Sequence, residues 1–515
     1  MNFGKISKNI IIIITEVAAI LLMVFNILPR ELALFLTGLL IFYFIFSPLE
    51  DSLWVFIASI PLFTALPITE NFDTLANWRI LLIVLFLVLF FKQGIWSKLF
   101  KQKFKHYQIE YLTGVFALLA CLSLLVADDF WIGAKKIIFL VNAFLLYIII
   151  RNLGAKNKLI FNKIISAMKT AVGIVLGIGL LQLIMVFFVN LHKFWYLWDR
   201  NVINVFYGID LSNLLSYSNT WFSYYSYQLP TLRMFSVFPD SHSFAFFSIL
   251  ALPMFLVSIL LFNRKSYRRI RLFGLYSLLI LCLLAIIFSG SRGAWVSAAG
   301  SLLAILFFTC FKKFRKEPQQ IQLVLGSLLL FFLLMPIASA ILFLPQYIQS
   351  GSEAALENVS LFERARSIVD FVETSVKGRL EIWVRTIDSI AMRPLLGVGI
   401  GNFPLVLNED LSFAKKGSSA HSLYLDFAAE MGIFALIILL IIFWKILKHA
   451  WQVFDQSRPG RIKVWIGFFI LALIWTFGYN LFDVVLLNDK VLLFFITNLA
   501  LLYVTKSSLS FHQSS

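Results

Sequence analysis

A single charged residue, Arg292, interrupts the apolar stretch 272–311, within the sequence IIFSGSRGAWVSAAG. A charged side chain deep in hydrocarbon costs roughly 2.5 to 3.5 kcal/mol on insertion scales, so we expect Arg292 at a membrane interface or facing a polar cavity. It can mark a helix boundary by extending its charge to the interface. Alternatively, its guanidinium and the N–H groups of the small-residue turn bind an anion.

A second arginine, Arg233, lies in the sequence LRMFSVFPDSHSF, shortly before the apolar segment 243–262. Two arginines on one face of the protein can bind a diphosphate through bidentate hydrogen bonds, which lysine does less well. Taken alone, Arg233 is equally well read as a ligand or as part of a salt bridge in a loop. Asp240 and His242, in the same stretch, are interpreted as capping and turn residues.

His421 opens a further apolar segment, in SSAHSLYLDFAAEMG. A histidine at a helix start is an interfacial or capping residue, or a general base near neutral pH. Asp426 and Glu430 share one helix face because they are four residues apart, and that face lies on the opposite side of the helix from His421. Both carboxylates need partners near a membrane, and Arg292 or Arg379 would serve.

The other polar residues give only weak indications of a metal, nucleotide or catalytic site. Asp128 and Asp129 are adjacent carboxylates in a short loop, which is a poor metal site, and GVGIG lacks the G-x-G-x-x-G spacing of a dinucleotide fold. Ser289 and Ser291 have no base near them in the sequence and are interpreted as turn residues rather than nucleophiles. The three cysteines show no CxxC spacing. We therefore expect no metal and no cofactor.

The elements that position these residues are membrane spans. The chain has 515 residues, of which 60% are hydrophobic and 14% charged, unlike a soluble domain. Backbone groups that face lipid must be satisfied within each segment, so we predict an all-α polytopic transmembrane bundle of about 12–14 spans. The candidate spans cover about 9–28, 31–48, 53–69, 78–92, 108–127, 133–150, 165–189, 243–262, 272–289, 293–311, 321–346, 421–447, 463–483 and 490–505. The first is expected to be a retained anchor rather than a cleaved signal peptide.

The net charge of +17 is dispersed in short basic runs between spans, which argues against nucleic acid as a partner. An even number of candidate spans separates each basic run from the next. Because basic residues mark cytoplasmic loops, both termini are predicted to be cytoplasmic. The basic runs are Lys92–Lys105, Arg151–Lys163, Arg264–Arg271, Lys312–Lys316 and Lys445–Lys463.

This topology divides the chain into five regions and brings three outer segments to one face. We expect N-terminal transmembrane helices over 1–190, an extracytoplasmic loop over 191–242, central transmembrane helices over 243–346, a large extracytoplasmic loop over 347–420 and C-terminal transmembrane helices over 421–515. The two loops and the Ser289–Gly293 turn can then meet outside the membrane.

The large loop is expected to contain a short helix. The sequence RLEIWVRTIDSIAM from Arg379 places Trp383, Ile387 and Ile390 at helical spacing, which predicts an amphipathic helix on or near the membrane surface. Pro394 and the glycines after it would end this helix.

Four stretches, taken in order, resemble the superfamily of bacterial O-antigen ligases, O-antigen polymerases and O-linked oligosaccharyltransferases. They are RMFSVFPDSHSF at Arg233, SGSRGAW at Arg292, GRLEIWVRTIDSIAMRPLLGVGIGNF from Gly378, and AHSLYLDFAAEMGIFAL from Ala420. The resemblance spans residues 230–436, whereas the first 190 residues share only the multi-span character. One departure is Ser422, where the family commonly has asparagine after the histidine.

The resemblance implies a GT-C-like fold and transfer of a glycan from an undecaprenyl diphosphate donor to a hydroxyl of a glycan, lipid or protein acceptor. It implies a metal-independent, inverting reaction at the outer face of the bacterial cytoplasmic (inner) membrane. Arg233 and Arg292 match positions that hold the donor diphosphate, with Arg379 in support, and His421 matches the histidine assigned to acceptor activation.

Two other functions fit a polytopic membrane protein. A transporter or flippase for lipid-linked glycans would carry charged residues through the middle of its spans. The notable charges here cluster at one end, although Glu16 in the first span is an exception without an assigned role. An accessory protein without catalysis would keep Arg292 and His421 far apart.

Overall fold

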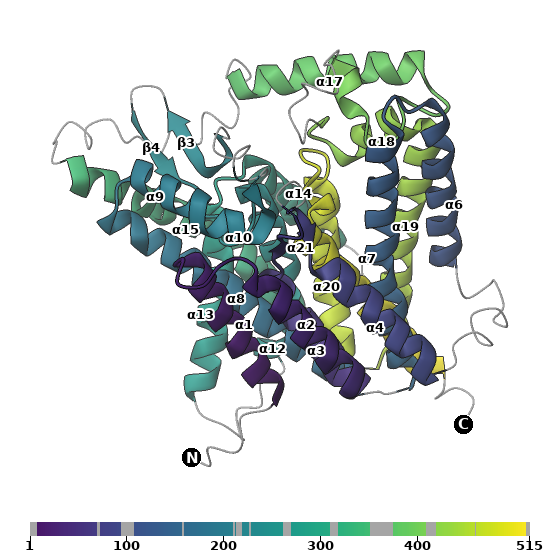
Figure 1. Cartoon of the computed structure of the whole chain (residues 1–515), viewed down its shortest axis with the longest axis horizontal. Helices are drawn as coiled ribbons and strands as arrows, with labels where there is room; N and C mark the ends of the chain where they lie inside the picture. Colours follow the sequence, from purple (N-terminus) through teal and green to yellow (C-terminus); the bar gives the residue numbers. More distant parts are fainter. Residues whose placement is uncertain are drawn as a thin grey trace.

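The structure is a computed structural model that describes residues 8–69, 73–93, 108–156, 159–209, 212, 219–225, 228–260, 269–309, 318–350, 374–407, 419–458 and 460–510. These residues form an all-α bundle with two small β-hairpins (Figure 1). The long helices lie side by side, and α17 (Thr374–Met392) lies across one end of them. We call this end of the bundle the α17 end.

The N-terminal half supplies several of the helices of the bundle. The helices of this half are α1 (Lys8–Val24), α2 (Leu32–Phe46), α3 (Leu49–Ala58), α4 (Trp78–Gln93), α6 (Gln108–Ser123), α7 (Phe130–Lys156) and α8 (Ile160–Phe188). Strands β1 (Ala65–Leu66) and β2 (Leu75–Ala76) pair as an antiparallel hairpin between α3 and α4. The predicted span 53–69 is therefore wrong in its bounds, because Pro61 stands in a 3-10 turn after Ala58 and no continuous helix passes it.

Short elements connect this half to the central helices. They are α9 (Leu191–Leu197), a π-helical turn (Trp198–Ile203), α10 (Asn204–Tyr207), and strands β3 (Phe222–Tyr225) and β4 (Gln228–Leu232). Strands β3 and β4 form an antiparallel hairpin at the α17 end.

The central and C-terminal helices complete the bundle. They are α12 (Ser241–Leu260), α13 (Arg269–Phe288), α14 (Arg292–Thr309), α15 (Pro318–Ser350), α18 (Leu423–Met431), α19 (Ile433–Gln456), α20 (Arg461–Tyr479) and α21 (Asp489–Ser510). Helix α12 is apolar on all sides and packs against α8, α13, α20 and α21, so its side chains are buried almost throughout. It forms the centre of the bundle.

Many of these helices are long and apolar enough to span a membrane. Within the described ranges, 7 helices are long and apolar enough to cross a membrane, and Leu32–Phe46, Leu272–Phe288 and Arg292–Phe307 are shorter apolar helices. In Figure 1, the start of α1 and the end of α21 lie at the end opposite α17. This agrees with both termini on one side; which side is cytoplasmic stays a prediction.

The predicted span 421–447 is wrong as one continuous helix, because the chain breaks at Gly432 between α18 and α19. Gly432 has φ +84°, and a Cβ at this position would collide with the carbonyl group of Leu395. The Ile433 N–H donates to the Pro394 oxygen at 2.8 Å. The segment after α17 therefore packs into the break, and only a glycine fits there.

Candidate functional site

The SGSRG sequence forms the turn that starts α14, with Arg292 as the first helical residue. Gly290 has φ +65°, and Ser289 Oγ accepts the N–H of Ser291 at 3.2 Å. Ser291 Oγ accepts the N–H of Ala294 at 3.4 Å, which caps the helix. The interpretation of both serines as turn residues is thus confirmed. Arg292 is half-buried at the α14 N-terminus, where the helix dipole also favours an anion.

Arg233 lies directly beside this turn. Its backbone N–H donates to the Trp221 oxygen at 2.8 Å, and its Nε donates to Ser223 Oγ in strand β3 at 2.8 Å. A Cβ built on Gly290 would stand 3.3 Å from Cγ of Arg233. The hairpin β3–β4 therefore holds the Arg233 side chain against the turn that carries Arg292, and the two arginine-bearing segments meet.

A cluster of polar side chains joins α12, α14 and α20 next to these arginines. Nδ1 of His242 lies 3.1 Å from Ser291 Oγ and 3.2 Å from the Tyr479 hydroxyl. The carboxylate of Asp483 lies 3.5 Å from the same nitrogen. The interpretation of His242 as a turn or capping residue is wrong, because it is inside α12 with its ring directed at α14 and α20.

Tyr479 and Asp483 were not predicted as site residues from the sequence. Polar residues at the end of an apolar segment are also common at membrane interfaces without any functional role. Both are buried. The available signal was topological: the end of the predicted span 463–483 lies on the same predicted face as the Ser289–Gly293 turn.

Asp240 has the capping role that was predicted for it. Its carboxylate accepts the Ser243 N–H at 2.6 Å and the Ser243 hydroxyl at 2.7 Å. Burial raises the pKa of Asp240 to about 6, and the negative charge of Asp483 acts in the same direction. Asp240 therefore fixes the start of α12, two residues before His242.

His421 lies just before α18, in the left-handed region with φ 48°. The Ala420 oxygen accepts the Trp383 Nε1–H at 2.9 Å, and the Ala420 N–H donates to Asp426 at 3.1 Å. The Leu423 N–H donates to the Asn480 oxygen at 2.9 Å. Helices α17, α18 and α20 thus hold His421 in an unfavourable backbone conformation, which is common at functional sites. The prediction that His421 starts the helix is wrong, so the helix-face argument does not apply to it.

His421 is electrically neutral at physiological pH. Burial lowers its pKa to about 4, and the positive charge of Arg379 lowers it further, against a smaller opposite effect of Asp426. Burial raises the pKa of Asp483 to about 6, and Arg379 opposes that rise. Arg379, half-buried on α17, therefore acts electrostatically on both groups.

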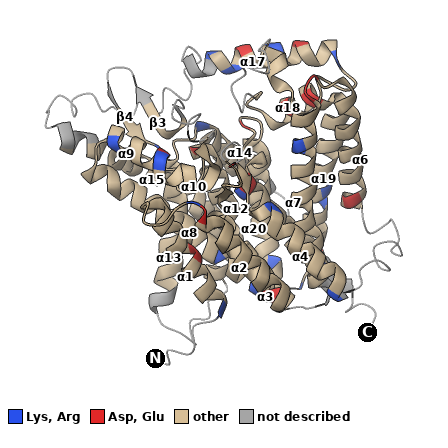
Figure 2. Cartoon of the chain, viewed as in Figure 1, with Lys and Arg blue, Asp and Glu red and all other residues tan. Residues whose placement is uncertain are grey.

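Helix α17 confirms the predicted amphipathic helix and extends it at its N-terminus to Thr374. Leu380, Val384 and Ile387 are exposed, whereas Ile382 and Ile390 pack toward α18. Charges of both signs are distributed along it (Figure 2). The helix ends at Met392, before Pro394, as predicted.

The carboxylates of Asp426 and Glu430 pair with Lys136 of α7, at 3.7 Å and 2.6 Å, respectively. The expectation of Arg292 or Arg379 as partners is therefore wrong. Sequence offers no signal for this pairing because α7 and α18 are far apart in the chain. The ion pairs fix α18, and hence the segment with His421, against α7.

Among the residues that the structure describes, no three or more His, Cys, Asp and Glu side chains are grouped to hold a metal ion. Asp129 instead accepts the N–H groups of Trp131 and Ile132 at 2.8 Å and 3.0 Å, at the start of α7.

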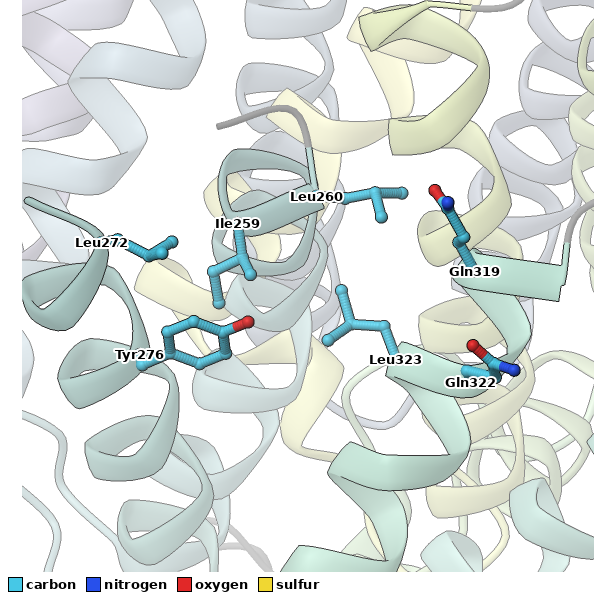
Figure 3. Close-up of a pocket in the computed structure, with 7 residues that line it drawn as sticks. All are labelled: Ile259, Leu260, Leu272, Tyr276, Gln319, Gln322 and Leu323. Atoms are coloured by element: carbon cyan, nitrogen blue, oxygen red, sulfur yellow. The ribbon is translucent and has the colours of Figure 1, made fainter. Parts of the chain in front are cut away.

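A pocket of about 450 Å³ lies between α12, α13 and α15 (Figure 3). Ile259 and Leu260 border it at the C-terminal end of α12, whereas His242 is at the N-terminal end. About 26 Å of helix separates the two positions. The pocket is therefore not part of the candidate site.

Comparison with known proteins shows that part of the chain is similar to a known family. Residues 275–440 match the family model described as O-Antigen ligase. The matched segment contains Arg292, Arg379 and His421, and Arg233 precedes it. No curated protein sequence matches the chain. This match over residues 275–440 and the multi-span helical fold support the predicted resemblance to the O-antigen ligase and O-antigen polymerase superfamily.

Proposed function

We propose that this protein is an integral membrane glycosyltransferase that moves a glycan from an undecaprenyl diphosphate-linked donor to an acceptor hydroxyl. The reaction would take place at the outer face of the bacterial cytoplasmic membrane, in the synthesis of cell-surface polysaccharide. The observation that carries the proposal is the packing of Arg233 against Gly290, in the turn that ends at Arg292. Two separate segments, each carrying a permanently charged arginine, thus pack against each other.

The chemistry of a lipid diphosphate leaving group accounts for such a pair. As the glycosidic bond breaks, negative charge develops on the diphosphate, and fixed cations in a partly dry site stabilise it. Arginine suits this role because it binds phosphate oxygens in bidentate fashion. Arg233 and Arg292 would hold the diphosphate, with Arg379 in support, and no metal or cofactor is required.

The acceptor hydroxyl would approach from the side of α18. The neutral ring of His421 can accept a hydrogen bond from a hydroxyl and align it on the anomeric carbon, whose configuration would be inverted by direct attack. The polyprenyl tail would lie between spans. This placement predicts that His421 variants act on the acceptor and that Arg233 and Arg292 variants act on the donor.

Gene deletion followed by complementation tests this function in cells. A polymerase predicts loss of chain length with single glycan units retained, and a ligase predicts loss of attachment with accumulation of lipid-linked polymer. A flippase predicts donor trapped on the cytoplasmic side. Arg292→Ala should fail to restore the surface glycan, whereas Arg200→Ala should restore it, because Arg200 is exposed and packs on Tyr196 outside the site. Full activity of Arg292→Ala would overturn the site assignment.

A further inference from the structure

The two nitrogens of His242 have different surroundings. Nδ1 faces Ser291, Tyr479 and Asp483, at 3.1, 3.2 and 3.5 Å. No hydrogen bond joins Nε2 to any residue of the described ranges, and the side chain is 16% exposed. One edge of the ring is therefore held by the protein, and the other edge remains available to a substrate.

The negative charge of the Asp483 carboxylate, 3.5 Å from Nδ1, favours the ring proton on that nitrogen. An ionised carboxylate can only accept a hydrogen bond, so Asp483 favours the tautomer with the proton on Nδ1. The hydroxyls of Ser291 and Tyr479 can either donate or accept and adapt to this choice. Nε2 then carries a lone pair, which is the state of a histidine that is ready to remove a proton. An aspartate orients histidine in the same way in serine hydrolases.

We propose that His242 is a catalytic general base of this protein, with Asp483 as its positioning residue. The proposal rests on the glycosyl transfer proposed above. The acceptor hydroxyl gives its proton to Nε2 of His242 as its oxygen bonds to the anomeric carbon of the donor. The bond from that carbon to the diphosphate oxygen breaks, and its electron pair leaves with the diphosphate. The imidazolium later returns its proton to water.

The charges around His242 link this step to the donor. The cations Arg233, just after β4, and Arg379, from α17, act electrostatically on the ring, and Tyr479 at the end of α20 and Asp483 just beyond it face the ring. A diphosphate bound by the arginines adds negative charge beside the ring, which favours the imidazolium that forms during the step. In this proposal, His421 aligns the acceptor hydroxyl and His242 accepts its proton.

Purified full-length protein in lipid vesicles provides the test. The donor is lipid-linked glycan extracted from cells lacking the gene, the acceptor is membrane from the same cells, and release of undecaprenyl diphosphate is followed. His242→Gln keeps a hydrogen-bonding side chain but has no basic nitrogen. We expect its kcat to fall about 100-fold or more, with the half-saturating acceptor concentration changed less than about threefold. His192→Ala, an exposed histidine of α9, should retain the wild-type rate.

Chemical rescue separates a base from a structural residue. Added imidazole should restore part of the rate of His242→Ala, and a series of substituted imidazoles should restore it in proportion to their basicity. Asp483→Asn should lower kcat by about tenfold or more without weakening acceptor binding, and Asp483→Glu should recover part of the loss. A wild-type kcat in His242→Gln, or no restoration by any imidazole, would overturn the role of His242. A wild-type protein that releases no undecaprenyl diphosphate would instead overturn the proposed function.

Discussion

Lys136 of α7 and Glu430 of α18 form an ion pair of 2.6 Å across 294 positions of the chain. The Lys136 ammonium also lies 3.7 Å from Asp426, whose carboxylate accepts the N–H of Ala420. The pair therefore connects a helix of the N-terminal half to the residue before His421. In this way the helices α1–α8, which contribute none of the predicted site residues, support the site.

Replacing Lys136 with methionine should destabilise the protein. Asp426 and Glu430 would remain buried without their cation, a change that costs about 3 to 5 kcal/mol in comparable sites. The melting temperature in detergent should fall by several degrees. Lys135→Met is the matched control, since Lys135 is the exposed neighbour on the same helix. Equal melting temperatures of the two variants would show that the ion pair does not hold α18.

Gly290→Ala should lower activity by disturbing the turn between the two arginines. A left-handed residue with a Cβ costs about 1 to 2 kcal/mol, and the added atom would press on Arg233 at 3.3 Å. We expect weaker donor binding together with a modest loss of stability. Gly300→Ala, in α14 with no atom within 4 Å of the new Cβ, should behave like wild type. Donor titrations of both variants check this, and equal donor affinities would contradict the placement of Arg233.

Arg379 and Arg385 lie on the same helix and allow a matched comparison. Arg379 acts on His421 and Asp483, whereas Arg385 is exposed and donates to the Leu407 oxygen at 3.2 Å. Arg379→Ala should lower kcat over KM by about tenfold, a loss of about 1.4 kcal/mol of transition-state stabilisation. Arg385→Ala should change it less than twofold. Similar losses in both variants would assign Arg379 no special role.

Activity should fall as the pH drops through about 6. The pKa values of Asp240 and Asp483 are raised to about 6, so both become protonated there, and Asp483 then loses the charge that orients His242. Because these pKa values are higher in the folded state than in unfolded chains, protonation favours folding, and the loss of rate is not an unfolding effect. Rates measured from pH 5 to 8 alongside melting temperatures test this; a rate that stays constant down to pH 5 would contradict it.

Much of the architecture could be predicted from the sequence because membrane spans and glycine turns are local features. Hydropathy located the helices, and the SGSRG turn and the amphipathic helix α17 followed from small residues and helical spacing. Grouping Arg233, Arg292 and His421 on one face needed only the even number of spans between basic runs. Each of these inferences uses neighbouring residues or a count along the chain.

Features that depend on contacts between distant segments could not be predicted. The break at Gly432 exists because Pro394 and Leu395 pack against it. The partner of Glu430 comes from α7, and His242 meets Tyr479 only when α12 packs against α20. In each case the residue types were visible, but their neighbours were set by tertiary packing.

Glycan transfer by the isolated protein tests the central claim most directly. Purified wild-type protein in vesicles, supplied with extracted lipid-linked glycan and acceptor membrane but no added metal, should release undecaprenyl diphosphate and form a glycosylated acceptor in equal amounts. Arg292→Ala should do so at a rate lower by about 100-fold. Release of no diphosphate by the folded wild-type protein, or transfer by Arg292→Ala at the wild-type rate, would contradict the account.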